Sequence, residues 1–152
     1  MTFANSSIGE MLHTGFEYDL WANMRWYNSL RLMRNQEAAS PVLQHILTTQ
    51  RTWLDRCGVS VDGIPRAATR VAFEAANAAW IELLGSQPLD KMIDYKDSRG
   101  RDHRRQLGEI AWHVINHGTF NRGHLRGLAH AESFEEFSDT DLIYYLDEVR
   151  KP

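Results

Sequence analysis

Apolar side chains recur every three or four residues along most of this chain, which is the period of an α-helix with one buried face. This spacing predicts four long helices, at about residues 8–33, 41–58, 69–84 and 104–130. Pro41 fits the first turn of the second helix, because its fixed φ angle suits that position. Gly58 is the expected end of the second helix, and Gly85 followed by Pro88 ends the third.

Two shorter stretches depart from the helical period. Residues 92–97 alternate apolar and polar side chains and precede Ser-Arg-Gly, a pattern typical of a short β-hairpin arm before the last long helix. Residues 139–146 predict a short strand or helical turn laid on the helices. Four long helices with so little strand predict an all-α, four-helix bundle, in which facing helices place metal ligands in the core.

Composition narrows the class of protein. The chain has 152 residues, of which 43% are hydrophobic, so we expect one domain spanning residues 1–152 with a single core. Its 17 basic and 20 acidic residues leave a net charge of −3, which speaks against a nucleic-acid partner. The lone Cys57 excludes an intramolecular disulfide and suits a reducing compartment. No apolar run approaches the roughly 18–20 residues of a membrane span, so we expect a cytoplasmic protein without a membrane partner.

The chemistry of the chain is concentrated in the fourth predicted helix. His113, His117 and Asn121 follow one another at intervals of four residues, so they share one helix face. Two ligands at this spacing can hold one metal ion. His45, in the second helix, lies in an apolar pattern that indicates a buried or boundary position. The simplest predicted site is therefore His45, His117, Asn121 and water, although an amide is a weak, hard ligand for zinc-like metals.

Two further histidines provide alternatives to that ligand set. His124 follows His117 by seven residues, or about 10.5 Å along the helix axis, so one ion cannot easily bridge the two. It could instead share an ion with Asn121 one turn further on. His113 could assist from outside the ligand set. All of these histidines also have an interpretation without metal, as hydrogen-bonded or surface side chains.

The pair Arg122–Gly123 has two interpretations. In the first, Gly123 lets a neighbouring backbone come close while Arg122 pairs with a carboxylate outside the core. In the second, Arg122 is an ordinary solvated side chain beside a tolerated glycine.

Four segments together carry a resemblance to a known family: residues 18–23 (Tyr-Asp-Leu-Trp-Ala-Asn), 45–56, 113–123 and 139–146. In this order, and over nearly the whole chain, they resemble the DinB family within the DinB/YfiT-like group, regarded as metalloenzymes. The resemblance implies an up-down-down-up four-helix bundle that is often a homodimer. It also implies a divalent metal, commonly zinc or nickel, held by three histidines.

Carried over residue by residue, the resemblance assigns the first two ligands to His45 and His117. The third falls on Asn121, because the family reads His-Arg-Gly-Gln where this chain reads Asn-Arg-Gly-His. Related members act as S-transferases or isomerases that use bacillithiol or mycothiol. The resemblance therefore implies a metal-dependent transferase or hydrolase acting on a low-molecular-weight thiol or another small molecule. Two alternatives stay open: a metal-free relative that binds a small molecule without turnover, and a dimeric structural protein.

Overall fold

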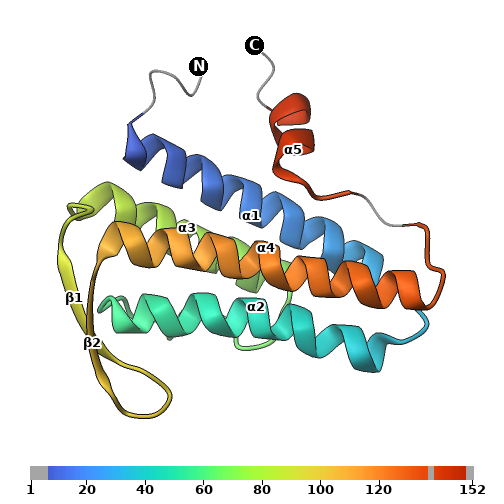
Figure 1. Cartoon of the computed structure of the whole chain (residues 1–152), viewed down its shortest axis with the longest axis horizontal. Coiled ribbons are helices and arrows are strands. Elements are labelled where there is room, and N and C mark those ends of the chain that lie inside the picture. The colour runs from blue at the N-terminus through green and yellow to red at the C-terminus, as the bar shows by residue number, and fades with distance from the viewer. Residues whose placement is uncertain (1–6, 137–138, 150–152) are drawn as a thin grey trace.

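The structure is a computed structural model that describes residues 7–136 and 139–149 (Figure 1). Within those ranges the chain forms α1 (Ile8–Leu30), α2 (Gln36–Arg56), α3 (Arg70–Ser86), β1 (Met92–Lys96), β2 (Asp102–Gln106), α4 (Leu107–Ala131) and α5 (Leu142–Val149). The protein is thus mostly helical with one small two-stranded sheet, which confirms the predicted helical class and the short hairpin.

Side chains just outside the helices explain where the helices begin. Ser7 and Glu10 form a reciprocal capping box at the start of α1, and Thr69 accepts a hydrogen bond from the Ala72 amide at the start of α3. α4 begins at Leu107 rather than near residue 104, because the chain up to Gln106 is paired in β2.

The predicted start of α2 was wrong by about one turn. The side chain of Asn35 accepts a hydrogen bond from the Ala38 amide at 3.2 Å and starts the helix at Gln36. Pro41 therefore lies inside the helix, not in its first turn. Its ring is exposed to solvent, and the helix continues through it at the loss of one backbone donor.

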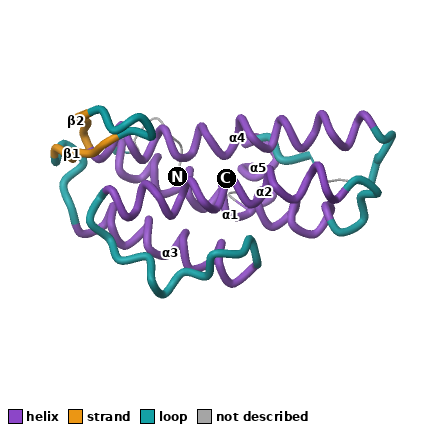
Figure 2. The backbone as a smooth tube through the Cα atoms, turned by 90° about the horizontal axis from the view of Figure 1, so that it is seen from below, coloured by secondary structure: helices purple, strands orange, loops and turns teal. Residues whose placement is uncertain are grey.

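The long helices run side by side, with α2 packed on α4, and α1 packed on both α3 and α4 (Figures 1 and 2). Aromatic stacking joins α1 to α3, where the ring centres of Phe16 and Trp80 are 4.9 Å apart. The core between the helices is formed by fully buried apolar side chains, the largest of which are Trp80, Phe16, Phe73, Ile46, Leu47, Leu54, Leu107, Leu125 and Val114. None of the helices in the described part of the chain is both long and apolar enough to cross a membrane.

The hairpin β1–β2 lies beside one end of the helices (Figure 2). Its strands are antiparallel, with Ile93 opposite Arg105 and Tyr95 opposite His103. Gly100 adopts a φ of +76° in the turn, a conformation that side chains other than glycine rarely reach. Because opposite residues in such a pair share a face, these four side chains lie together on the face that includes the buried Ile93.

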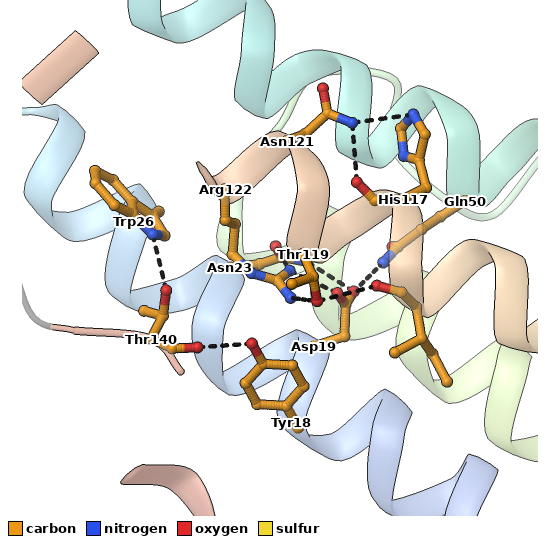
Figure 3. A network of polar contacts seen from close by, with 11 residues as sticks. Tyr18, Asp19, Asn23, Trp26, Gln50, His117, Thr119, Asn121, Arg122 and Thr140 are labelled. Carbon is orange, nitrogen blue, oxygen red and sulfur yellow. Dashed lines mark hydrogen bonds and ion pairs between the residues drawn. The ribbon is translucent and has the colours of Figure 1, made fainter. Parts of the chain in front are cut away.

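The C-terminal segment crosses α1 on its way to α5. The Tyr18 hydroxyl donates to the carbonyl oxygen of Thr140 at 2.6 Å, and the Trp26 indole donates to the Thr140 hydroxyl at 3.1 Å (Figure 3). Tyr145 is the buried side chain of α5 and packs beside Tyr18. The segment predicted as a short strand or helical turn is therefore a two-turn helix held against α1.

Candidate metal and ligand site

Side chains spaced four residues apart on α2 and α4 face one another where the two helices meet. His45, Thr49 and Trp53 lie on α2, and His113 and His117 face them from α4. His45 and Thr49 contact His117, whereas Trp53 contacts His113, so the two helices run antiparallel here. We call these five side chains the α2–α4 row.

The polar centre of the α2–α4 row is the pair His45 and His117. Their Nε2 atoms are 3.0 Å apart, which is a direct hydrogen-bond contact between the two imidazoles. The Nδ2 atom of Asn121 lies 3.1 Å from the same nitrogen of His117 and also donates to the His117 carbonyl at 2.9 Å (Figure 3). The Thr49 hydroxyl is 3.4 Å from the His117 nitrogen. The structure therefore brings together all three side chains of the predicted ligand set.

The expected position of His45 was wrong, because its side chain is exposed to solvent. Its neighbours Ile46 and Leu47 fill the core, which turns His45 toward solvent. His117 is half-buried and Asn121 is buried. The cluster thus opens to solvent at one side rather than lying in the core between the helices.

His117 is held in its neutral form. Burial, and then the neighbouring charges of His45 and His113 when they are protonated, lower the pKa of His117 to about 4. Partial burial and the charge of Arg56 also lower the pKa of His113. Neutral imidazoles keep a lone pair for a metal ion or a proton donor at neutral pH.

The two alternative histidines lie in different places. The ring centre of His113 is 6.1 Å from that of His117 and 5.4 Å from that of Trp53. His124 is exposed and lies beyond Asn121 on α4, seven residues from His117. Among the residues that the structure describes, no group of three or more His, Cys, Asp or Glu side chains is placed to hold a metal ion.

A buried polar network lies behind this cluster, toward the core. Arg122 donates to Asp19 at 2.5 Å and to Asn23 at 2.8 Å (Figure 3). Asp19 also accepts hydrogen bonds from Asn23 at 3.0 Å and from Gln50 on α2 at 2.6 Å. Burial alone would lower the pKa of Arg122, but the charge of Asp19 raises it overall, so the guanidinium stays charged. The network joins α1, α2 and α4.

The first interpretation of Arg122–Gly123 was right that Arg122 pairs with a carboxylate, but wrong about where the pair lies and about the glycine. Arg122 is buried, and Asp19 on α1 faces it across the helix interface, so the pair lies inside the protein. The second interpretation, a solvated arginine, was wrong. A side chain at Gly123 would meet no other atom within 4 Å, so close packing does not need this glycine. The glycine that does permit a close approach is Gly118, where an added Cβ would collide with the Asp19 carboxylate.

The sequence interpretation missed five residues of the α2–α4 row and the network: Thr49, Trp53, Asp19, Asn23 and Gln50. Thr49 and Trp53 follow His45 at intervals of four, the same signal that identified His113 and His117 on the facing helix. Asp19 and Asn23 are also four residues apart on α1, whereas Gln50 has no comparable signal. All three are polar residues that look like surface positions until the partner helix is placed.

Comparison with known proteins yields one weak similarity. The chain is 21% identical to protein DinB of Bacillus subtilis (strain 168) over 157 aligned positions, which cover 86% of this chain and 91% of that protein. No protein-family model matches the sequence, and no solved structure matches it. The similarity over most of the chain suggests a DinB-like family.

Proposed function

We propose that this protein is a DinB-like metal-dependent enzyme whose divalent ion, zinc or nickel, is held by His45 and His117, with Asn121 beside it. The observation that carries the proposal is the 3.0 Å separation of the two Nε2 atoms. The proposal also includes the fold, a DinB-type up-down-down-up four-helix bundle. The protein would act in the cytoplasm as a homodimer, on a low-molecular-weight thiol or another small molecule.

The donor atoms fit a divalent ion with two strong protein ligands. Zinc–nitrogen bonds of about 2.0–2.1 Å at a tetrahedral angle place two ligand nitrogens about 3.3 Å apart. The pair needs only a few tenths of an ångström of movement to reach that separation. Asn121 turns its NH₂ group toward His117, so its amide is arranged as a hydrogen-bond donor rather than as a third ligand.

Each residue then has a distinct role. A metal at this position would lower the pKa of a bound water or thiol and supply a nucleophile at neutral pH. His45 would hold it from α2 and His117 from α4. Asn121 is anchored by its hydrogen bond to the His117 carbonyl, contacts the His117 imidazole at 3.1 Å, and can donate to an oxygen of a bound molecule. The exposed side of His45 leaves an approach for a small substrate.

Metal content tests the proposal directly. Tag-free protein grown with zinc, nickel, manganese or iron is analysed for bound metal, beside His45→Gln, His117→Gln and the control His124→Gln. We expect close to one equivalent in the wild type and the control, and a large loss in the other two. Less than about a tenth of an equivalent under every supplement would overturn the proposal, since a site of useful affinity stays filled under excess metal.

One observation favours a second function, the binding of a small molecule without metal. With its NH₂ group directed at His117, Asn121 completes a set of donors and acceptors that can bind a polar ligand by hydrogen bonds alone. In that case His45→Gln would leave metal content unchanged at zero. A dimeric structural role is the remaining alternative. It would be favoured if the His45→Gln variant bound the same small molecules as the wild type.

A further inference from the structure

A hollow lies beneath the hairpin, at the end of the α2–α4 row formed by Trp53 and His113. This hollow has a volume of about 290 Å³ and is lined by Trp53, Tyr95, Arg105, Glu109, Ile110 and His113. Trp53 is one helical turn from Thr49 on α2, and His113 is one turn from His117 on α4. The hollow therefore lies next to the histidine pair. We call this hollow the hairpin pocket.

Three aromatic rings form the walls of the hairpin pocket. The ring of Trp53 meets that of Tyr95 edge-on, with ring centres 4.8 Å apart, and meets that of His113 in the same way at 5.4 Å. Tyr95 reaches this place because it shares a face of the hairpin with the buried Ile93. Flat apolar walls of this kind suit a planar or apolar molecular body.

Positive charge borders the same walls. The Arg56 guanidinium lies 4.5 Å from the ring centre of Trp53 and 5.3 Å from that of Tyr95. Arg105 lines the pocket from β2. Within the described part of the chain neither arginine forms an ion pair, whereas Arg101 and Arg104 of the same hairpin pair with Asp97 and Asp94.

The one acidic residue of the hairpin pocket has a structural partner. Glu109 accepts a hydrogen bond from the Gln106 amide at 3.1 Å, as part of the cap of α4. A carboxylate in the first turn of a helix is favoured by the helix dipole. Among the described residues, Arg105 in the lining and Arg56 beside the Trp53 ring thus have no ion-pair partner, whereas the one carboxylate of the pocket already serves the helix start.

We propose that the hairpin pocket binds a small organic carboxylate, with its carbon body against Trp53 and Tyr95 and its charge on Arg105, supported by Arg56. A molecule held there lies beside His113, one helical turn from His117 on α4. Its role as the substrate of that centre rests on the proposed function, whereas its binding does not. The guanidinium contributes charge-assisted hydrogen bonds that a neutral amide of the same shape cannot replace.

The test compares benzoate with benzamide, which differ in charge but hardly in shape. Protein treated with a chelator, so that no metal can coordinate the carboxylate, is titrated while the indole signal of Trp53 is followed by NMR. We expect saturable binding of benzoate and at least roughly fivefold weaker binding of benzamide, because one charge-assisted contact is lost. Arg105→Gln should remove this preference.

Arg104→Gln is the matched control, because Arg104 is the neighbour of Arg105 in β2 and points to the opposite face of the hairpin. It should leave benzoate binding within about twofold of the wild type, as expected for a charge outside the pocket. Equal binding of benzoate and benzamide, or no saturable shift up to about 20 mM, overturns the inference. Because the chelator removes any metal in this experiment, its outcome tests the hairpin pocket alone, whereas the metal analysis of untreated protein tests the proposed function.

Discussion

At the scale of single residues, Arg122 supplies the positive charge of the buried polar network. It lies on α4 one position after Asn121, and its guanidinium holds two α1 side chains, those of Asp19 and Asn23. A buried charge pair is costly to break, because the partner that remains is left as an unpaired charge in the interior. The rotation of α4 about its axis, and hence the direction of His117 and Asn121, depends on this contact.

Replacing Arg122 by methionine, which keeps much of the volume, should therefore destabilise the protein by about 3–5 kcal/mol. Urea unfolding followed by circular dichroism measures the effect. The control is Arg126→Ala on the next turn, whose ion pair with Asp139 is exposed and should contribute at most about 1 kcal/mol. A similar loss in both variants would contradict the role of the buried network.

Gly118 gives a second prediction at this scale. We expect Gly118→Ala to destabilise the protein by about 1–3 kcal/mol, because its Cβ would displace the Asp19 carboxylate or the Arg122 guanidinium. The same change at Gly123, where nothing lies within 4 Å, should stabilise α4 by up to about 1 kcal/mol. Thermal unfolding of the two variants measures both effects. A Gly118→Ala protein as stable as the wild type would show that the interface can relax.

Asn121→His tests the third ligand position. A third imidazole in place of the amide should tighten zinc binding by at least roughly tenfold. The melting temperature in excess zinc should then rise, since an ion that binds only the native state stabilises it. Asn116→His, an exposed position of the same helix, is the control. Equal zinc affinity in both variants would mean that residue 121 takes no part in binding.

At the scale of elements, the hairpin depends on the carboxylate of Asp97. It accepts hydrogen bonds from the Arg99 and Arg101 amides, at 2.8 and 3.0 Å, and contacts the His103 ring at 3.0 Å. The Arg101 amide, followed by His103, holds the pKa of Asp97 well below its usual range. His103 in turn stacks on Tyr95, with ring centres 5.4 Å apart, so the turn positions a wall of the hairpin pocket.

This lowered pKa predicts a dependence of hairpin order on pH. A carboxyl whose folded pKa lies below its ordinary value of 3.8 stabilises the fold fully above that pH, and the contribution is lost as the pH falls. NMR signals of β1 and β2 should therefore weaken below about pH 4 in the wild type. In Asp97→Asn they should be weaker at neutral pH and change little on acidification. Identical pH profiles for the two proteins would contradict this assignment.

Element boundaries show where local patterns suffice. The hairpin and α3 lie within a few residues of their predicted ranges, because alternation and capping act between neighbours in the sequence. The start of α2 was missed because both an asparagine cap and a proline indicate the start of a helix. The structure begins the helix after the Asn35 cap, not at the proline. The exposure of His45 was missed for a different reason: an apolar neighbourhood in sequence does not tell which side of a helix meets its partner.

At the scale of the whole molecule, the elements differ in how much they bury. The helices α1, α2 and α4 share the core and the Asp19–Arg122 network, whereas α5 buries only Tyr145 among its described side chains. Segments with few buried contacts open at lower free energy than the core. The molecule is thus expected to unfold in parts, with α5 and the hairpin opening before the long helices.

Hydrogen exchange followed by mass spectrometry tests that order. Peptides from α5 and from the hairpin should exchange faster than peptides from the middle of α1 and α4. Each roughly 1.4 kcal/mol of lower opening free energy raises the exchange rate about tenfold. Peptides from α2 serve as an internal reference for the core. Protection of α5 equal to that of α1 would show that the tail is part of the same cooperative unit.

The sequence by itself determined the helices, the hairpin and the histidine series on α4, because hydrophobic period, caps and turn residues act over a few positions. Only the tertiary structure decided that the Nε2 atoms of His45 and His117 come within 3.0 Å. It also decided that Asp19 meets Arg122 across 103 positions and that Gly118 makes room for them. The physical reason is that the apolar face of each helix is set by residues close together in the sequence. The rotation of one helix against another is instead set by packing between residues far apart in the chain.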